Sequence, residues 1–169
     1  MNYQFRIAEG LLAAIHADLS RPHAHAYERV GFIHCRFGAG PHRSVILAQD
    51  YASVADADYL ESEVMGAVMG PTAIRLALQA VYRHQGPVFH VHRHDHDGIP
   101  GFSRVDLRES AKFVPDFWKV APKMPHGAMV LSHDAATGRV WCPRNHEAQP
   151  LTSIVSVGTR LTRLGAAHD

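Results

Sequence analysis

Cysteine is scarce in this sequence, and its two cysteines lie far apart. Cys35 and Cys142 form no Cys-x-x-Cys pair, so the sequence indicates neither a disulfide framework nor a cysteine zinc site. A chain of 169 residues is long enough to bury a hydrophobic core without such cross-links. We therefore predict one domain over residues 1–169, in a reducing compartment such as the cytoplasm.

An excess of charge and a long apolar run are also missing. The 17 Lys and Arg residues balance 16 Asp and Glu residues, so there is no basic stripe of the kind that neutralises a phosphate backbone. No segment approaches the roughly 20 consecutive apolar residues that span a bilayer, and the N-terminus lacks a signal-peptide pattern. We therefore expect a soluble, unprocessed protein that binds neither nucleic acid nor a membrane.

Histidine, in contrast, is abundant, with 14 in the chain. Residues 90–96 read His-Val-His-Arg-His-Asp-His, which places four histidines on alternate positions. Alternate side chains of a strand point to the same face, and neutral imidazole is the commonest metal ligand. The run therefore predicts a metal clamp on a strand. Five other histidines have no such spacing and are predicted to be surface or structural residues: His16, His23, His25, His34 and His126.

Hydrophobic periodicity and turn residues predict a mixed α/β (α+β) fold with a mainly antiparallel sheet. Three helices are predicted over residues 11–19, 71–84 and 103–113. Strands are predicted over residues 27–37, 44–54, 88–92, 128–132, 138–142 and 154–164. Residues 55–66 are predicted to be irregular, with a short strand at most.

A zinc hydrolase site needs few protein ligands. Three ligands commonly hold the metal and leave a fourth position to water, so two histidines and one carboxylate are enough. Residues 90–106 supply both ligand types. A hydrolase also needs a general base for the water and a hydrogen-bond donor for the oxyanion, which must come from other positions.

Two further motifs resemble those of the JAMM metalloproteases, also called JAB or MPN+ domains. That family's pattern is a distant Glu followed by H-x-H-x7-S-x-x-D. Here residues 103–106 read Ser-Arg-Val-Asp, and residues 28–33 read Glu-Arg-Val-Gly-Phe-Ile, similar to the family's E-x-x-G-x-L segment. The resemblance covers residues 5–142 in organisation. It implies a single MPN/JAB-like domain with a curved sheet flanked by helices.

The histidine spacing departs from this pattern. The family has seven residues between its second ligand histidine and the Ser, whereas ten follow His92, eight follow His94 and six follow His96. Spacing alone favours His92 with His94, or His94 with His96. Strand chemistry favours His90 with His92, because the residue between two ligands turns into the fold and valine suits that position better than arginine or aspartate. We predict His90 and His92 as ligands, with His94 as the substitute.

The resemblance also implies roles for the other motif residues. Asp106 completes the zinc ligand set, Glu28 is the general base, and the Ser103 hydroxyl stabilises the oxyanion. Ser103 and Asp106 also suit the start of a helix, as N-cap and first-turn carboxylate.

The activity that the resemblance implies is zinc-dependent cleavage after the C-terminus of a ubiquitin-like protein, in maturation or deconjugation. The compact chain is similar to bacterial deubiquitinase-like isopeptidases that accompany conjugation enzymes. One alternative is a non-catalytic MPN scaffold that binds metal incidentally. Another is a JAB-type peptidase that acts on a different peptide, such as one from a cell wall or a phage tail.

Overall fold

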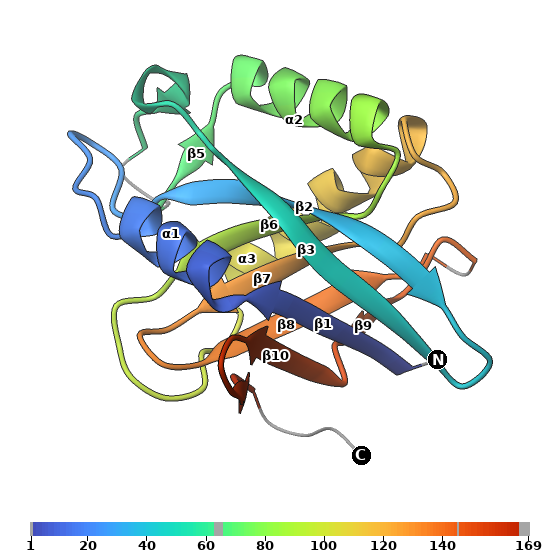
Figure 1. The fold of residues 1–169 in the computed structure, drawn as a ribbon. Coiled ribbons are helices and arrows are strands. Elements are labelled where there is room, and N and C mark those ends of the chain that lie inside the picture. Colours follow the sequence, from blue (N-terminus) through green and yellow to red (C-terminus); the bar gives the residue numbers. More distant parts are fainter. Residues whose placement is uncertain (1, 63–65, 145, 166–169) are drawn as a thin grey trace.

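A curled sheet forms the middle of the fold in this computed structural model, which describes residues 2–62, 66–144 and 146–165 (Figure 1). Within these ranges the sheet has nine strands. Their order across the sheet is β11 (Leu161–Arg163), β10 (Ser153–Val157), β1 (Asn2–Ala8), β3 (Arg43–Ser53), β2 (Val30–Ala39), β6 (Val88–Arg93), β7 (His126–Leu131), β8 (Ala136–Trp141) and β9 (Ala148–Pro150). A separate hairpin pairs β4 (Tyr59–Leu60) with β5 (Val68–Met69).

The sheet is mixed but mainly antiparallel, as predicted. Strand β1 runs parallel to both β10 and β3, and β6 runs parallel to β7. The remaining neighbours are antiparallel. A parallel pair needs a long crossover, and the segment between β6 and β7 is the crossover that holds the histidine loop and a helix.

Helices cover both faces of this sheet (Figure 1). They are α1 (Glu9–Leu19), α2 (Pro71–His84) and α3 (Arg104–Phe113), with short 3-10 helices at Asp56–Asp58 and Val114–Lys119. One core cluster includes α1 together with Phe89 and Val91 of β6. A second cluster includes α2 together with Val88. Because side chains alternate along a strand, His90 and His92 lie on the α2 face.

The predicted helices and central strands are confirmed. Helix α2 spans the predicted residues 71–84, since Pro71 suits its first turn and Gln85 ends it in a left-handed conformation with φ of 51°. Helix α3 begins directly after Ser103, which is its N-cap. The two predicted hairpins correspond to β2 with β3 and to β7 with β8.

The edge of the sheet differs from the prediction. Residues 2–8 form β1, a strand that we did not predict, although its alternate residues are buried as strand periodicity requires. The single strand predicted over residues 154–164 is wrong. A turn separates β10 from β11, and in it the backbone N–H of Gly158 donates to the carbonyl of Arg160 at 3.1 Å.

The segment between β3 and α2 contains the short 3-10 helix at Asp56–Asp58 and the β4–β5 hairpin. The prediction for residues 55–66 is therefore right in including a short strand, while residues 63–65 lie outside the described part of the chain. No helix within the described ranges is long and apolar enough to cross a membrane.

Candidate metal centre

Strand β6 ends within the histidine run, on the face of the sheet that α2 covers. Strand β6 ends at Arg93, but the backbone N–H of His94 still donates to the carbonyl of Leu131 on β7 at 2.8 Å. The chain is therefore held beside β7 through His94, and the His92 and His94 rings meet. Their Nε2 atoms lie 3.3 Å apart.

The first turn of α3 brings a carboxylate to these two rings. Ser103 and Asp106 form a capping box, in which the Ser103 N–H donates to Asp106 Oδ2 at 2.7 Å and the Asp106 N–H donates to Ser103 Oγ at 3.1 Å. This fixes the Asp106 carboxylate at the helix N-terminus. Its Oδ1 lies 3.5 Å from His92 Nε2, and its Oδ2 lies 3.8 Å from His94 Nε2.

The electrostatics of this group favour the forms that bind a metal. Burial works to raise the pKa of Asp106, but interactions with His92 and with the Ser103 N–H and hydroxyl outweigh it and lower the pKa below the usual range. Burial, followed by the charge of His92, lowers the pKa of His94. At neutral pH the site therefore presents a carboxylate and a neutral imidazole, which are the ligating forms.

The segment just before β2 is anchored by a buried arginine. The Arg29 side chain is 2% exposed and donates to the carbonyls of Arg21 and Pro22 at 2.8 and 2.9 Å. It also donates to the Asp56 carboxylate at 2.7 Å. Because these three bonds fix Arg29, the backbone of its neighbour Glu28 is fixed as well.

Glu28 lies beside the two histidines. A carboxylate oxygen of Glu28 and one nitrogen each of His92 and His94 all lie within 4.8 Å of one another. The Glu28 N–H donates to the carbonyl of Gly66 at 3.1 Å, so the chain before β5 packs closely against it. The structure thus gathers the predicted Glu28, His92 and Asp106, together with the substitute ligand His94.

The donor set fits a zinc ion. Tetrahedral zinc with ligands at about 2.0–2.2 Å has ligand atoms roughly 3.3–3.6 Å apart. His92 Nε2 and His94 Nε2 are 3.3 Å apart, and Asp106 approaches them with different oxygens, Oδ1 at 3.5 Å from His92 and Oδ2 at 3.8 Å from His94. The first two distances match such a tetrahedron, and the Asp106 carboxylate must turn for one oxygen to reach an ion shared by both histidines. Glu28 stands beside these side chains and offers a further carboxylate oxygen to a metal.

His90 lies two residues before His92 on β6 and lines the same cavity as His92 and Asp106. Its ring packs against Phe113 and Phe32, with centroids 5.4 and 5.8 Å away, and its Nε2 is buried without a hydrogen-bond partner. Burial, followed by the charge of His92, lowers the pKa of His90 to about 3. Among the described residues, neither His90 nor Asp106 belongs to a group whose ligand atoms all converge, but Asp106 lies 3.5 and 3.8 Å from the two converging histidines. His96 is exposed.

Arg93 explains why an arginine is tolerated between two converging histidines. Its guanidinium donates to Ser20 Oγ at 2.7 Å, at the end of α1, and to Asp95 at 3.1 Å. The residue between the two converging histidines thus has polar partners on the other face of the sheet. The argument for valine at this position applies to an apolar environment, whereas Arg93 lies at the end of the strand. The spacing of eight residues before Ser103 is the sequence signal that favoured a pair containing His94.

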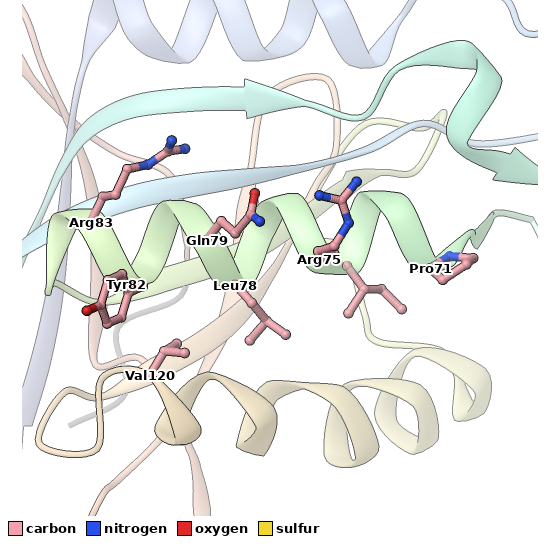
Figure 2. Close-up of a pocket in the computed structure, with 8 residues that line it drawn as sticks. Pro71, Arg75, Leu78, Gln79, Tyr82, Arg83 and Val120 are labelled. Atoms are coloured by element: carbon pink, nitrogen blue, oxygen red, sulfur yellow. The ribbon is translucent and has the colours of Figure 1, made fainter.

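A cavity opens beside the metal centre. It has a volume of about 200 Å³, and its wall includes Glu28, His92 and Asp106. The rest of the wall combines Gly66, His90, Glu109 and Ser110 with apolar residues: Val30, Ala67, Val68, Met69, Ile74, Val105 and Phe113. Ile74 also lines a wider groove of about 780 Å³ between α2 and Val120, into which Leu78 and Tyr82 project (Figure 2).

Comparisons with known proteins give no family. No protein-family model matches this chain, and no curated protein matches it significantly. Among solved structures, the Trichoplax adhaerens STIL N-terminal domain is similar over 79% of this chain and 40% of that chain, with a TM-score of 0.37 and 10% sequence identity. This chain therefore spans less than half the length of that structure.

Proposed function

We propose that this chain is a zinc-dependent peptidase of the JAMM (JAB/MPN+) type, with His92, His94 and Asp106 as zinc ligands. The observation that carries the proposal is the close approach of these three side chains, at 3.3 to 3.8 Å, with Glu28 beside them. The same residues follow the family's motif order. His94 thereby takes the place of His90 in the ligand set.

The wider arrangement supports an MPN/JAB-like fold. Glu28 follows the first long helix and precedes the central strand β2, and α2 precedes the histidine strand β6. Helix α3 opens at Ser103, the first residue of the S-x-x-D motif. These are the elements that the resemblance implies, in the same order along the chain.

Each residue has a distinct chemical task in this proposal. Bound zinc would act as a Lewis acid and make a water molecule nucleophilic at neutral pH. A Glu28 carboxylate oxygen takes a proton from the attacking water and passes it to the leaving amine nitrogen. The Ser103 hydroxyl accepts the Asp106 N–H, and its own hydrogen is then the donor for the oxyanion.

The size of the cavity favours a slender substrate. At about 200 Å³, and with Val68, Ile74 and Phe113 in its wall, it suits an extended chain without bulky side chains. The glycine-ended tail of a ubiquitin-like protein has this shape. We therefore propose that the chain cleaves after such a tail, in maturation or deconjugation, and that it works beside the enzymes that conjugate that protein.

The test is cleavage of a ubiquitin-like protein that carries a C-terminal extension, followed by mass spectrometry. Glu28→Gln should lower the rate by about 10²–10⁴-fold, the typical contribution of a general base, while zinc stays bound. Glu9→Gln is the matched control, since Glu9 lies on α1, on the opposite face of the sheet, and should leave cleavage unchanged. Wild-type cleavage by Glu28→Gln would disprove the assigned base.

Two other outcomes identify the alternatives. Stoichiometric zinc without cleavage of any extended ubiquitin-like protein favours a scaffold. Cleavage of unrelated peptides, lost on Glu28→Gln, keeps the chemistry but assigns a different substrate.

A further inference from the structure

A second cluster of ligand-type side chains lies at the other end of the central strands. It combines His34 of β2, Asp50 of β3 and His84, the last residue of α2. One ligand atom from each lies within 4.8 Å of the other two. His34 stands four residues from Val30, the residue of β2 that pairs with His92. At about 3.3 Å per residue, the two clusters are roughly 13 Å apart along β2.

Local structure explains why these side chains meet. His34 and Asp50 are directly opposed across the β2–β3 pair, at a bulge where the register shifts before Cys35. Bulges often redirect a side chain, and here His34 Nδ1 lies 2.7 Å from Asp50 Oδ1. The end of α2 then places the His84 ring over His34, with centroids 5.0 Å apart and planes at 21°.

His34 carries an unsatisfied polar atom. Its side chain is 7% exposed, and its Nε2 is buried without a hydrogen-bond partner. A buried polar atom without a partner is costly and calls for an explanation. Asp50 holds the Nδ1 side of the ring, which leaves Nε2 as the free nitrogen. Metal-binding histidines commonly have this arrangement, with one nitrogen on a carboxylate and the other available to the metal.

We propose that His34 Nε2 and His84 hold a second zinc ion, with Asp50 orienting the His34 ring through Nδ1, independent of the centre at His92 and His94. Imidazole is a typical zinc ligand, and water can complete the coordination. The site also lies at the C-terminus of α2, where the helix dipole favours a cation.

Asp50 and His84 are exposed, so their side chains can move when an ion binds. A tetrahedral site requires ligand atoms about 3.3–3.6 Å apart, so the His84 ring must move to meet an ion held by His34 Nε2. His34 is fixed in the sheet, but the Asp50 side chain is 53% exposed and His84 is exposed. Both can move, and water can complete the coordination. Arg83 is a positive charge at this end of α2 and would repel a bound cation. Its side chain must therefore extend into solvent when an ion binds.

The experiment counts zinc ions on the untagged protein. Metal is removed with a chelator, and zinc is titrated back in competition with a chromogenic chelator. We expect two ions per wild-type chain. His84→Ala should bind one, and so should the double variant His92→Ala/His94→Ala, which lacks both imidazoles of the first centre. Combining all three substitutions should leave none.

Two further variants sharpen the test. Asp50→Asn should weaken binding of the second ion by about 10–100-fold, because Asp50 orients the His34 ring. His42→Ala is the matched control, because His42 is an exposed histidine in the turn between β2 and β3. It should bind two ions like the wild type. His84 and Asp50 are exposed, so neither substitution should prevent folding, which thermal unfolding followed by circular dichroism will check.

The outcomes separate this site from the proposed catalytic centre. If His84→Ala still binds two ions, or if His92→Ala/His94→Ala binds none, the second site is disproved. A single wild-type ion that is lost only in His92→Ala/His94→Ala leaves the catalytic proposal intact and overturns this one. If the wild type binds a single ion that is lost only in His84→Ala, the second site is supported, and the centre at His92 and His94 binds no zinc.

Discussion

A Cβ atom at Gly66 would lie 2.9 Å from Oε2 of Glu28. Side chains do not normally approach so closely, so only glycine lets the Glu28 carboxylate keep its present position. Gly66→Ala should displace this carboxylate while the proposed zinc ligands stay in place. Because small misplacement of a catalytic group is costly, we expect cleavage to fall by about 10–100-fold with unchanged zinc content. Steady-state cleavage rates and metal analysis measure the two effects.

A glycine on α1 offers a matched control for that substitution. No atom lies within 4 Å of a Cβ built at Gly10. Gly10→Ala should therefore preserve cleavage and stabilise the fold by about 0.5–1 kcal/mol, because alanine favours a helix interior. If Gly66→Ala also cleaves at the wild-type rate, the position of Glu28 does not limit the reaction.

Single substitutions along the histidine run should identify the zinc ligands. His92→Ala and His94→Ala should each weaken zinc binding by more than about 100-fold, since even the partners that orient a ligand are worth 10–100-fold. His90→Leu should keep the zinc, because the proposed ligand set of His92, His94 and Asp106 does not include the His90 ring, which packs against Phe113. Competitive zinc titration measures all three. Loss of zinc in His90→Leu, with retention in His94→Ala, would restore the His90–His92 pair.

The two functions of Ser103 can be separated by two substitutions. Ser103→Ala removes both the N-cap and the hydroxyl, so it should cost about 1 kcal/mol of stability as well as activity. Ser103→Gly keeps most of the capping preference but also lacks the hydroxyl, so its stability should fall by only a few tenths of a kcal/mol. Both should cleave about 10²–10³-fold more slowly, as expected for a lost oxyanion donor. Denaturant unfolding and cleavage rates distinguish the two effects, and a fully active Ser103→Gly would exclude the oxyanion role.

His126 should make the fold sensitive to mild acid. Its ring is fully buried, with Nδ1 accepting the Val88 N–H at 3.2 Å and Nε2 donating to the Ala121 carbonyl at 3.1 Å. Burial lowers the pKa of His126 from 6.5 to about 4. The unfolded chain therefore binds the proton more readily, and stability falls as the pH drops from about 6.5 toward 4. This group alone should cost about 2 kcal/mol at pH 5 relative to pH 7.5.

Denaturant unfolding at the two pH values, with chelator present, measures that loss. His126→Gln provides an amide with one acceptor and one donor that does not titrate, so its stability should fall by about 2 kcal/mol less than that of the wild type. His42→Gln, at an exposed position, should keep the wild-type pH dependence. Equal losses in wild type and His126→Gln would show that His126 is not the responsive group.

Local sequence signals predicted the bounds of an element correctly where the residues of that element alone determine them. Pro71 and the glycine-proline pair after Gln85 delimit α2, because a proline lacks the N–H that a helix interior needs. Ser103 and Asp106 specify the start of α3 through bonds between residues three apart. Strand β1 was missed although its buried residues alternate, and its partners β3 and β10 are far away in the sequence.

By itself, the sequence determined that alternate histidines share one face of a strand near a helix that begins with Ser103. It did not determine which two imidazoles meet Asp106, because the period of two applies equally to His90, His92 and His94. Tertiary structure decided that through the position of α3 along β6, which the loop between them and the packing of Phe113 set. It also decided the cluster around His34, whose members come from three elements that only folding brings together.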